Sequence, residues 1–273
     1  STRMPIYYAV GSSLVGVTAF GLTTAFNYAL DGWVDWPLAA IFIGGGVLGY
    51  RALAEHLGAE RPFYAFQAAG LEDDQAPLER VDALAERYVA ALSARQPEGP
   101  VHLIGWSFGG LIAFEMARQL QARGREVAAL VLIDSHLLEG RAFDLDEAAL
   151  LAMFERDVLA AAGLSAEPAA ASSPSLAERL ARWLPEVSER QLERHVAVFK
   201  AHARAAAAYE AAPFAGRLVY LQAEDGPDDA LAPWMRLADG LSAQRMPGDH
   251  YGMMAAPHVA TLAAALRALR PGP

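Results

Sequence analysis

A serine set among small residues is the most informative chemical feature of this sequence. Residues 105–110 read Gly-Trp-Ser-Phe-Gly-Gly and fit the pattern G-x-S-x-G, in which the serine occupies a sharp turn between a strand and a helix. The turn holds the serine in a strained backbone conformation, and a side chain at Gly105 or Gly109 would collide with the neighbouring helix or strand. The pattern predicts that Ser107 is a nucleophile.

A serine nucleophile needs an acid that orients and charges its base. Asp134 is the predicted acid because it directly follows an apolar run, and the carboxyl ends of buried parallel strands are where such sheets carry their chemistry. It would accept the imidazole N–H, fix the tautomer and stabilise the imidazolium. Asp225 or Glu224, which follow another apolar run, are the competing acids.

The predicted base is His250, which lies in the turn-rich segment 247–252. The resulting order along the chain, serine, then aspartate, then histidine, is the order expected of an α/β-hydrolase. The other histidines are less suited to this role: His195 and His202 are expected to be solvated on a charged helix, His56 and His258 to lie on surface helices, His102 to lie inside a strand, and His136 to be awkwardly close in sequence to the acid.

The elements that would position these residues follow from hydrophobic periodicity. Short apolar runs at 101–104 and 129–133 are typical of buried parallel strands, and 217–222 and 242–246 are further strand candidates. Residues 111–120 have apolar side chains at the three-to-four spacing of a helix, as expected directly after the serine turn. The serine, the acid and the base would therefore each follow a strand of one sheet.

With these motifs in place, the chain resembles the thioesterase domains that end nonribosomal peptide synthetases and related polyketide assembly lines. The resemblance covers about residues 37–273, and it is carried by the segments 44–58, 61–71, 84–135, 198–209, 223–230 and 247–254. It favours Asp134 over Asp225 as the acid. The fold that it implies is an α/β-hydrolase fold: a mostly parallel sheet with helices on both faces and an inserted helical lid.

The resemblance also implies a reaction. A carrier protein would deliver an acyl or peptidyl thioester on a phosphopantetheine arm, Ser107 would take the chain as an ester, and hydrolysis or macrocyclisation would release it. The oxyanion would be bound by the backbone N–H of Phe108 and by the loop that contains Gly44 and Gly45, because such donors must point at the developing charge. No metal and no organic cofactor is expected. Members of this family usually carry His-Pro before the glycine run, where this chain has Phe42-Ile43.

An insertion is expected between the acid and the next strand. Residues 140–210 interrupt the alternation of strands and helices, with helices predicted at 145–162, 176–184 and 191–209 and a linker rich in small residues at 166–175. Helices inserted at this point would lie over the serine as a lid and limit the access of water.

The segment before the domain is unusual because no charged residue occurs between Met4 and Leu30. Residues 5–30 are long enough to span a bilayer as a helix, and residues 8–48 also resemble a helical hairpin of sulfite-exporter-type permeases. The segment 1–36 is interpreted as a membrane anchor, as a foreign or mispredicted N-terminus, or as an extra soluble helix. We therefore set it apart from the domain at 37–273.

Composition limits the classes of function. The chain has 273 residues and 54% hydrophobic residues, enough for a substantial core. Its formal charge of −10 argues against nucleic-acid binding, and the absence of cysteine excludes thiolate chemistry and suits a cytoplasmic protein. A free-standing editing thioesterase, a general esterase and a catalytically silent membrane-anchored module remain the alternatives. The acyl chain and the choice between hydrolysis and cyclisation are left open.

Overall fold

A parallel sheet forms the centre of the molecule in the computed structural model, which describes residues 7–11, 46–57, 63–66, 68, 70–71, 75–138, 146–161 and 188–269. Within these residues the sheet has six strands in the order β2-β1-β3-β4-β5-β6, and every neighbouring pair is parallel. The strands are β1 (Tyr7–Gly11), β2 (Phe63–Phe66), β3 (Val101–Trp106), β4 (Val127–Ile133), β5 (Phe214–Ala223) and β6 (Ala238–Met246). The expected mostly parallel α/β architecture is confirmed.

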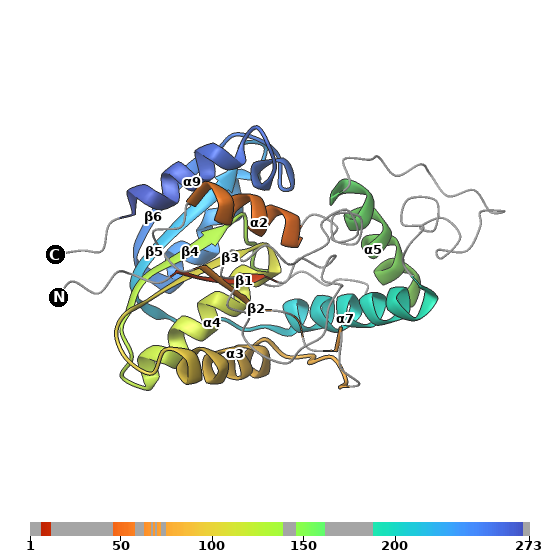
Figure 1. Cartoon of the computed structure of the whole chain (residues 1–273), viewed down its shortest axis with the longest axis horizontal. Helices are drawn as coiled ribbons and strands as arrows, with labels where there is room; N and C mark the ends of the chain where they lie inside the picture. The colour runs from red at the N-terminus through yellow and green to blue at the C-terminus, as the bar shows by residue number, and fades with distance from the viewer. Residues whose placement is uncertain are drawn as a thin grey trace.

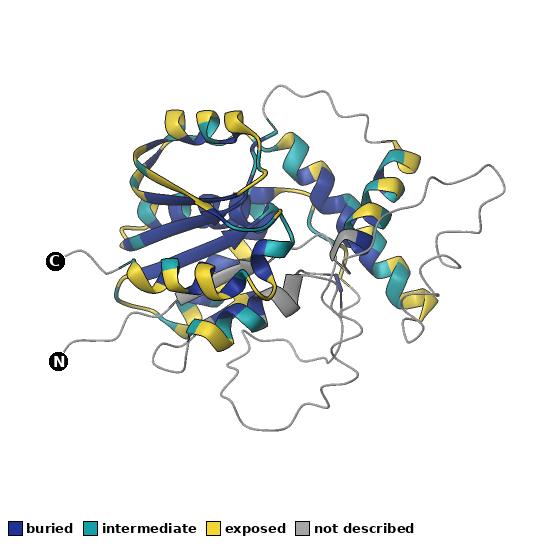
Figure 2. Cartoon of the chain, turned by 90° about the horizontal axis from the view of Figure 1, so that it is seen from above, coloured by how far each residue is buried: buried dark blue, intermediate teal, exposed yellow. Residues whose placement is uncertain are grey.

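Helices cover both faces of this sheet (Figure 1). Helices α3 (Val81–Arg95) and α4 (Phe108–Ala122) pack on one face, where their apolar residues form a cluster with Leu103, Leu130 and Leu132. Helices α2 (Gly46–Leu57) and α9 (Val259–Ala268) pack on the other face, against the alternate residues of the same strands. Successive residues of β3 and β4 are therefore buried on opposite faces, which explains why these strands are continuous apolar runs. Figure 2 shows the buried strands between helices whose outer sides are exposed.

Strand β1 lies within the segment 1–36 that the sequence led us to set apart. Its residues pair with β2 on one side and with β3 on the other, so the sheet includes residues ahead of the expected boundary at residue 37. A strand at residues 7–11 also differs from a membrane helix or a permease-like helical hairpin at this position. The physical reason is that a short run with tyrosine and valine suits a parallel strand. The remainder of 1–36, with Phe42 and Ile43, lies outside the described residues.

Among the described residues of the insertion between β4 and β5, two long helices lie at one end of the sheet in Figure 1. Helix α5 (Glu147–Ala161) and helix α7 (Glu189–Ala208) bury a small apolar cluster between them, in which the rings of Phe154 and Phe199 meet edge to face at 5.3 Å. These two helices confirm the predictions for 145–162 and 191–209. The helix predicted at 176–184 and the linker at 166–175 lie outside the described residues.

Three short helices complete the described chain. The 3-10 helix η1 (Asp228–Leu231) and helix α8 (Ala232–Leu237) connect β5 to β6, and η2 (Gly252–Met254) precedes α9. None of the helices in the ranges given above combines the length and the apolar character needed to cross a bilayer.

Candidate active site

The predicted turn at Ser107 joins β3 to α4. Ser107 has φ 57° and ψ −130°, a backbone conformation that is costly for a residue with a side chain. The predicted collision at Gly105 is confirmed, because a Cβ atom there would lie 2.3 Å from the carbonyl oxygen of Gly109. A Cβ atom at Gly110 would lie 1.9 Å from Oγ of Ser135. The turn thus requires glycine at 105 and at 110.

Hydrogen bonds fix the residues on either side of this turn. The backbone N–H of Ser107 donates to the carbonyl of Ile133 at 2.9 Å, and that of Trp106 donates to the Tyr50 hydroxyl at 2.9 Å. The Trp106 indole N–H donates to the carbonyl of His250 at 3.1 Å, and its ring stacks on the imidazole with centroids 5.1 Å apart. The residue before the serine therefore holds the loop that carries the predicted base.

Asp134 follows directly after β4 and is buried, with a side chain only 4% exposed. Its backbone N–H donates to the carbonyl of Leu221, and its Oδ1 accepts the N–H of Ala223, so both its backbone and its carboxylate are bonded to β5. Asp134 also has a positive φ of 42°. The next carbonyl, of Ser135, accepts bonds from the Tyr220 hydroxyl at 3.0 Å and the Trp234 indole at 2.8 Å.

The structure brings Ser107, His250 and Asp134 into one hydrogen-bonded chain. Nδ1 of His250 lies 2.6 Å from Oδ2 of Asp134, and Nε2 of His250 lies 3.1 Å from Oγ of Ser107. Because a carboxylate only accepts hydrogen bonds, Nδ1 carries the proton and Nε2 is left to accept the serine hydroxyl. The imidazole is 29% exposed while the carboxylate is 4% exposed, so of the two groups only the imidazole is open to solvent.

The electrostatics of Asp134 favour its ionised form. Burial alone would raise the pKa of this carboxyl, but the imidazoles of His136 and His250, together with the N–H of Ala223, hold the pKa well below its ordinary value. His136 contributes from a distance, since its Nε2 lies 3.6 Å from Oδ2, too far for a good hydrogen bond. The acid is thus an acceptor for the imidazole across the neutral pH range.

The loop of the base is shaped by a glycine and an aspartate. Gly248 has φ 94°, and its carbonyl accepts the N–H of Glu224 at 3.1 Å. Asp249 accepts the N–H of Gly252 at 2.6 Å, which closes the turn around His250. The two competing acids, Glu224 and Asp225, are exposed, and His250 bonds Asp134 instead.

Two expectations about histidines were wrong. His195 and His202 are buried, at 9% and 1% exposure, and not solvated. Both lie on the apolar side of α7, where His195, Val198, Phe199, His202 and Ala205 recur at helical spacing and face the protein interior. The charged residues that suggested exposure occupy the other side of the helix. His56 is exposed as expected, His258 is partly buried, and His102 lies inside β3.

The oxyanion site is only partly described. Phe108 is the first residue of α4, and a backbone N–H in the first turn of a helix has no acceptor within the helix. It is therefore available as the predicted donor. Gly44 and Gly45, the predicted source of the second donor, lie outside the described residues. Both roles stay predictions.

Sequence reasoning missed a contact between the insertion and the loop of the base. Tyr251 donates a hydrogen bond to Asp157 of α5, and burial raises the pKa of both groups above their ordinary values. The Tyr251 ring meets the His250 imidazole edge-on, with centroids 4.9 Å apart. No sequence signal identifies this pair, because only the packing of α5 brings the aspartate to the loop.

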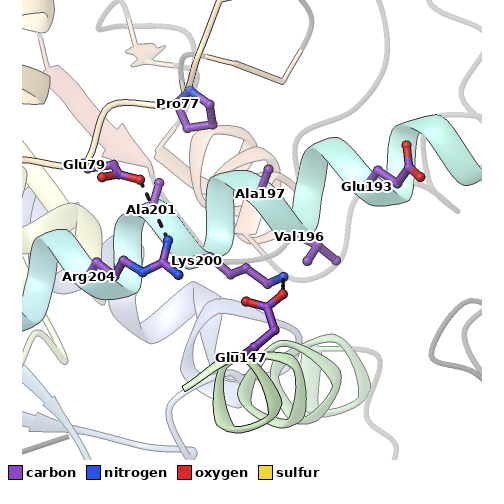
Figure 3. Close-up of a pocket in the computed structure, with 9 residues that line it drawn as sticks. All are labelled: Pro77, Glu79, Glu147, Glu193, Val196, Ala197, Lys200, Ala201 and Arg204. Carbon is purple, nitrogen blue, oxygen red and sulfur yellow. Dashed lines mark hydrogen bonds and ion pairs between the residues drawn. The ribbon is translucent and has the colours of Figure 1, made fainter. Parts of the chain in front are cut away.

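A separate surface hollow of about 400 Å³ lies on the outer side of α7 (Figure 3). Two ion pairs lie in it, Lys200 with Glu147 of α5 and Arg204 with Glu79 at 3.8 Å, and Glu193 also lines it. No member of the Ser107–His250–Asp134 chain lines it.

The sheet order, the turn at Ser107 and the residues that follow β4 and β6 define an α/β-hydrolase architecture. The family model of the thioesterase domain matches residues 39–268, and the chain belongs to this family.

Sequence relatives lie in large synthases. The chain is 44% identical over 91 residues to the polyketide synthase PksR of Bacillus subtilis (strain 168), covering 33% of this chain and 4% of that protein. It is 36% identical over 121 residues to a dimodular nonribosomal peptide synthase of the same organism, covering 43% of this chain and 5% of that protein. The matched region is thus a small part of each relative.

Solved structures agree in fold. The chain resembles AB3403, a four-domain nonribosomal peptide synthetase, with a TM-score of 0.74 and 30% identity, covering 84% of this chain and 19% of the other. It resembles the NocB thioesterase domain, solved as a covalent complex with a fluorophosphonate nocardicin G analogue, with a TM-score of 0.67 and 22% identity, covering 99% of this chain and 96% of the other. The second likeness is one of fold alone.

Proposed function

We propose that this chain releases an acyl or peptidyl chain from a phosphopantetheinyl carrier protein through an acyl ester on Ser107. The observation that carries the proposal is the hydrogen-bonded chain from Asp134 through His250 to Ser107, with distances of 2.6 and 3.1 Å. Membership of the thioesterase domain family supplies the substrate class, a thioester. The relatives, which are synthases and synthetases, support a carrier protein as the partner.

The first half of the reaction forms the ester. Nε2 of His250 takes the Ser107 proton as Oγ attacks the thioester carbonyl, and Asp134 stabilises the imidazolium that results. The negative charge on the carbonyl oxygen is stabilised by the N–H of Phe108 and by a donor from the Gly44–Gly45 loop. As the tetrahedral intermediate collapses, the C–S bond breaks and the departing pantetheine thiolate takes the proton from His250.

The second half opens the ester. His250 removes a proton from water, or from an amine or hydroxyl of the bound chain, and that oxygen or nitrogen attacks the ester carbonyl. The proton then returns to Oγ of Ser107. Water yields a free acid and an internal nucleophile yields a ring. Helices α5 and α7 are proposed as parts of a lid that limits water at this step.

These steps use only groups of the chain and of its substrate, and they require no metal or organic cofactor. Phosphopantetheine enters as part of the substrate, attached to the carrier protein. The strained turn at Ser107 and the buried carboxylate of Asp134 are both arranged before any substrate binds, which is the usual source of electrostatic catalysis.

Turnover of a panel of acyl and peptidyl thioesters by the full chain tests this function. Thiol release is followed with a thiol reagent and the product is identified by mass. Replacement of the serine, Ser107→Ala, removes the nucleophile and is expected to lower turnover by roughly 10⁵-fold or more while thermal unfolding stays unchanged. Equal turnover by Ser107→Ala and wild type would contradict the proposal.

A further inference from the structure

His202 is a buried histidine that reaches the turn at Ser107 from the insertion. It lies on α7, is 1% exposed, and packs its ring on that of Phe108, with centroids 4.8 Å apart and planes inclined by 34°. Phe108 directly follows the nucleophile and is the first residue of α4. An imidazole from a distant part of the chain is therefore placed beside the serine turn.

The ring nitrogens of His202 have no hydrogen-bond partner among the residues that the structure describes. The contrast with His195 on the same helix is informative, because Nδ1 of His195 lies 2.5 Å from the carbonyl oxygen of Gln191. Buried polar groups in folded proteins are normally bonded, and each exception needs an explanation. An imidazole held only for packing would be replaced at lower cost by an apolar side chain.

The charge state of His202 defines what it can bind. Burial lowers the pKa of His202 to about 4, so the ring is neutral near neutral pH. A neutral imidazole presents one N–H donor and one lone-pair acceptor. The complementary ligand is a group that both accepts and donates, such as a secondary amide or a hydroxyl, and not an anion.

We propose that His202 is a specificity-determining residue. Its ring nitrogens are covered in this structure, and a substrate chain that displaces the side chains over them would bring an amide or hydroxyl to His202, close to the carbonyl held on Ser107. The inference rests on the proposed function, since it concerns the chain delivered to that serine. It narrows the substrate class from any acyl chain to chains with such a group near the thioester, as in a peptidyl chain or a hydroxyacyl chain. A plain aliphatic acyl chain offers His202 no partner.

A pair of variants separates hydrogen bonding from packing. Leucine and asparagine have nearly the same size and shape, so His202→Leu and His202→Asn both lose the ring contact with Phe108, but only asparagine keeps a donor and an acceptor. The substrates are thioesters of equal length that carry an amide, a hydroxyl or only methylene groups near the carbonyl. The readout is the ratio of kcat/KM for each polar substrate to that for the aliphatic one.

We expect His202→Leu to lower this ratio about 10-fold, the usual value of a hydrogen bond, and His202→Asn to keep most of it. The polar substrate whose ratio falls more, the amide or the hydroxyl, identifies the group that His202 binds. Thermal unfolding of both variants checks that they fold, and His202→Phe provides a second apolar variant if His202→Leu does not. His102→Leu is the matched control: His102 is also buried, at 2% exposure, but it lies near the start of β3 whereas Ser107 follows its end.

A ratio unchanged in both apolar variants would overturn the inference, and so would an equal loss in the leucine and asparagine variants. Either result leaves the proposed function intact, because the wild-type chain still turns thioesters over. A wild-type chain that releases thiol from none of the substrates would overturn the proposed function, and this inference with it.

Discussion

The loop after β6 and the middle of α7 each bring a histidine to the surroundings of Ser107, and the two regions differ in whether the ring nitrogens of that histidine are hydrogen-bonded. In the loop, His250 has both ring nitrogens bonded, to Asp134 and to Ser107, and its ring stacks on Trp106. On α7, His202 is more deeply buried and packs on Phe108, yet neither ring nitrogen is bonded within the described chain.

The two regions therefore position their histidines in different ways, one by hydrogen bonds and the other by packing. The bonds around His250 come from residues at the ends of β3, β4 and β5, so the sheet fixes the reacting groups in advance. The insertion instead positions a polar ring by packing alone and leaves its bonding capacity unused. In the proposed function, the sheet would supply the chemistry and the insertion would select the chain on which it acts.

The largest effect is expected from a change to the hydrogen bond between Asp134 and His250. Asp134→Asn keeps the size of the acid but offers an amide that can donate to Nδ1, which places the imidazole proton on the nitrogen that must act as the base. Turnover should fall by about 10⁴-fold. The measurement is kcat/KM for a thioester that the wild type releases. A loss of less than 10-fold would assign the acid role to another carboxylate, and Asp225→Asn, an exposed position, serves as the control that should retain activity.

The unbonded histidine is expected to show in the acid stability of the fold. The folded-state pKa of His202 is about 4 against an ordinary value near 6.5, so between these values the unfolded chain binds a proton that the folded chain does not. Stability is then fully present above pH 6.5 and is lost as the pH falls toward 4. Integrated over this interval the loss is about 3 kcal/mol.

His202→Leu removes that proton linkage. Denaturant unfolding between pH 7 and pH 4 should therefore show a smaller acid loss in the variant than in the wild type, by about 3 kcal/mol. His102→Leu tests whether any buried histidine of this chain behaves in the same way. Parallel pH curves for wild type and His202→Leu would show that His202 binds its proton with the same pKa in the folded and the unfolded chain, and would contradict this prediction.

The positions of Ser107, Asp134 and His250 could be predicted well from the sequence, but the burial of His202 could not. The turn at Ser107 depends on local residues, and Asp134 and His250 each follow an apolar run, so patterns along the chain predicted that all three follow strands of one sheet, as they do in the structure. The burial of His202 depends on which side of α7 faces the interior, and the charged neighbours on that helix obscured it. The strand at residues 7–11 was missed because an uncharged segment was read for its length and not for its β-forming residues.

The smallest predicted effect concerns the link between the two regions. The Tyr251 hydroxyl, one residue after the base, donates to Asp157 of α5, and α5 packs against α7 through Phe154 and Phe199. Tyr251→Phe keeps the ring contacts with His250 and Trp106 but removes the donor from a partly buried carboxyl group.

We expect Tyr251→Phe to lower kcat/KM about 5- to 10-fold and to destabilise the fold by about 1–3 kcal/mol, because Asp157 loses its partner. Asp157→Asn is the control, since its amide oxygen still accepts the tyrosine hydroxyl and should preserve most of the activity. If Tyr251→Phe unfolds at the wild-type temperature and turns over at the wild-type rate, α5 is not tied to the loop of the base through this bond. The two regions would then act independently, and substrate selection on α7 would not be coupled to the position of His250.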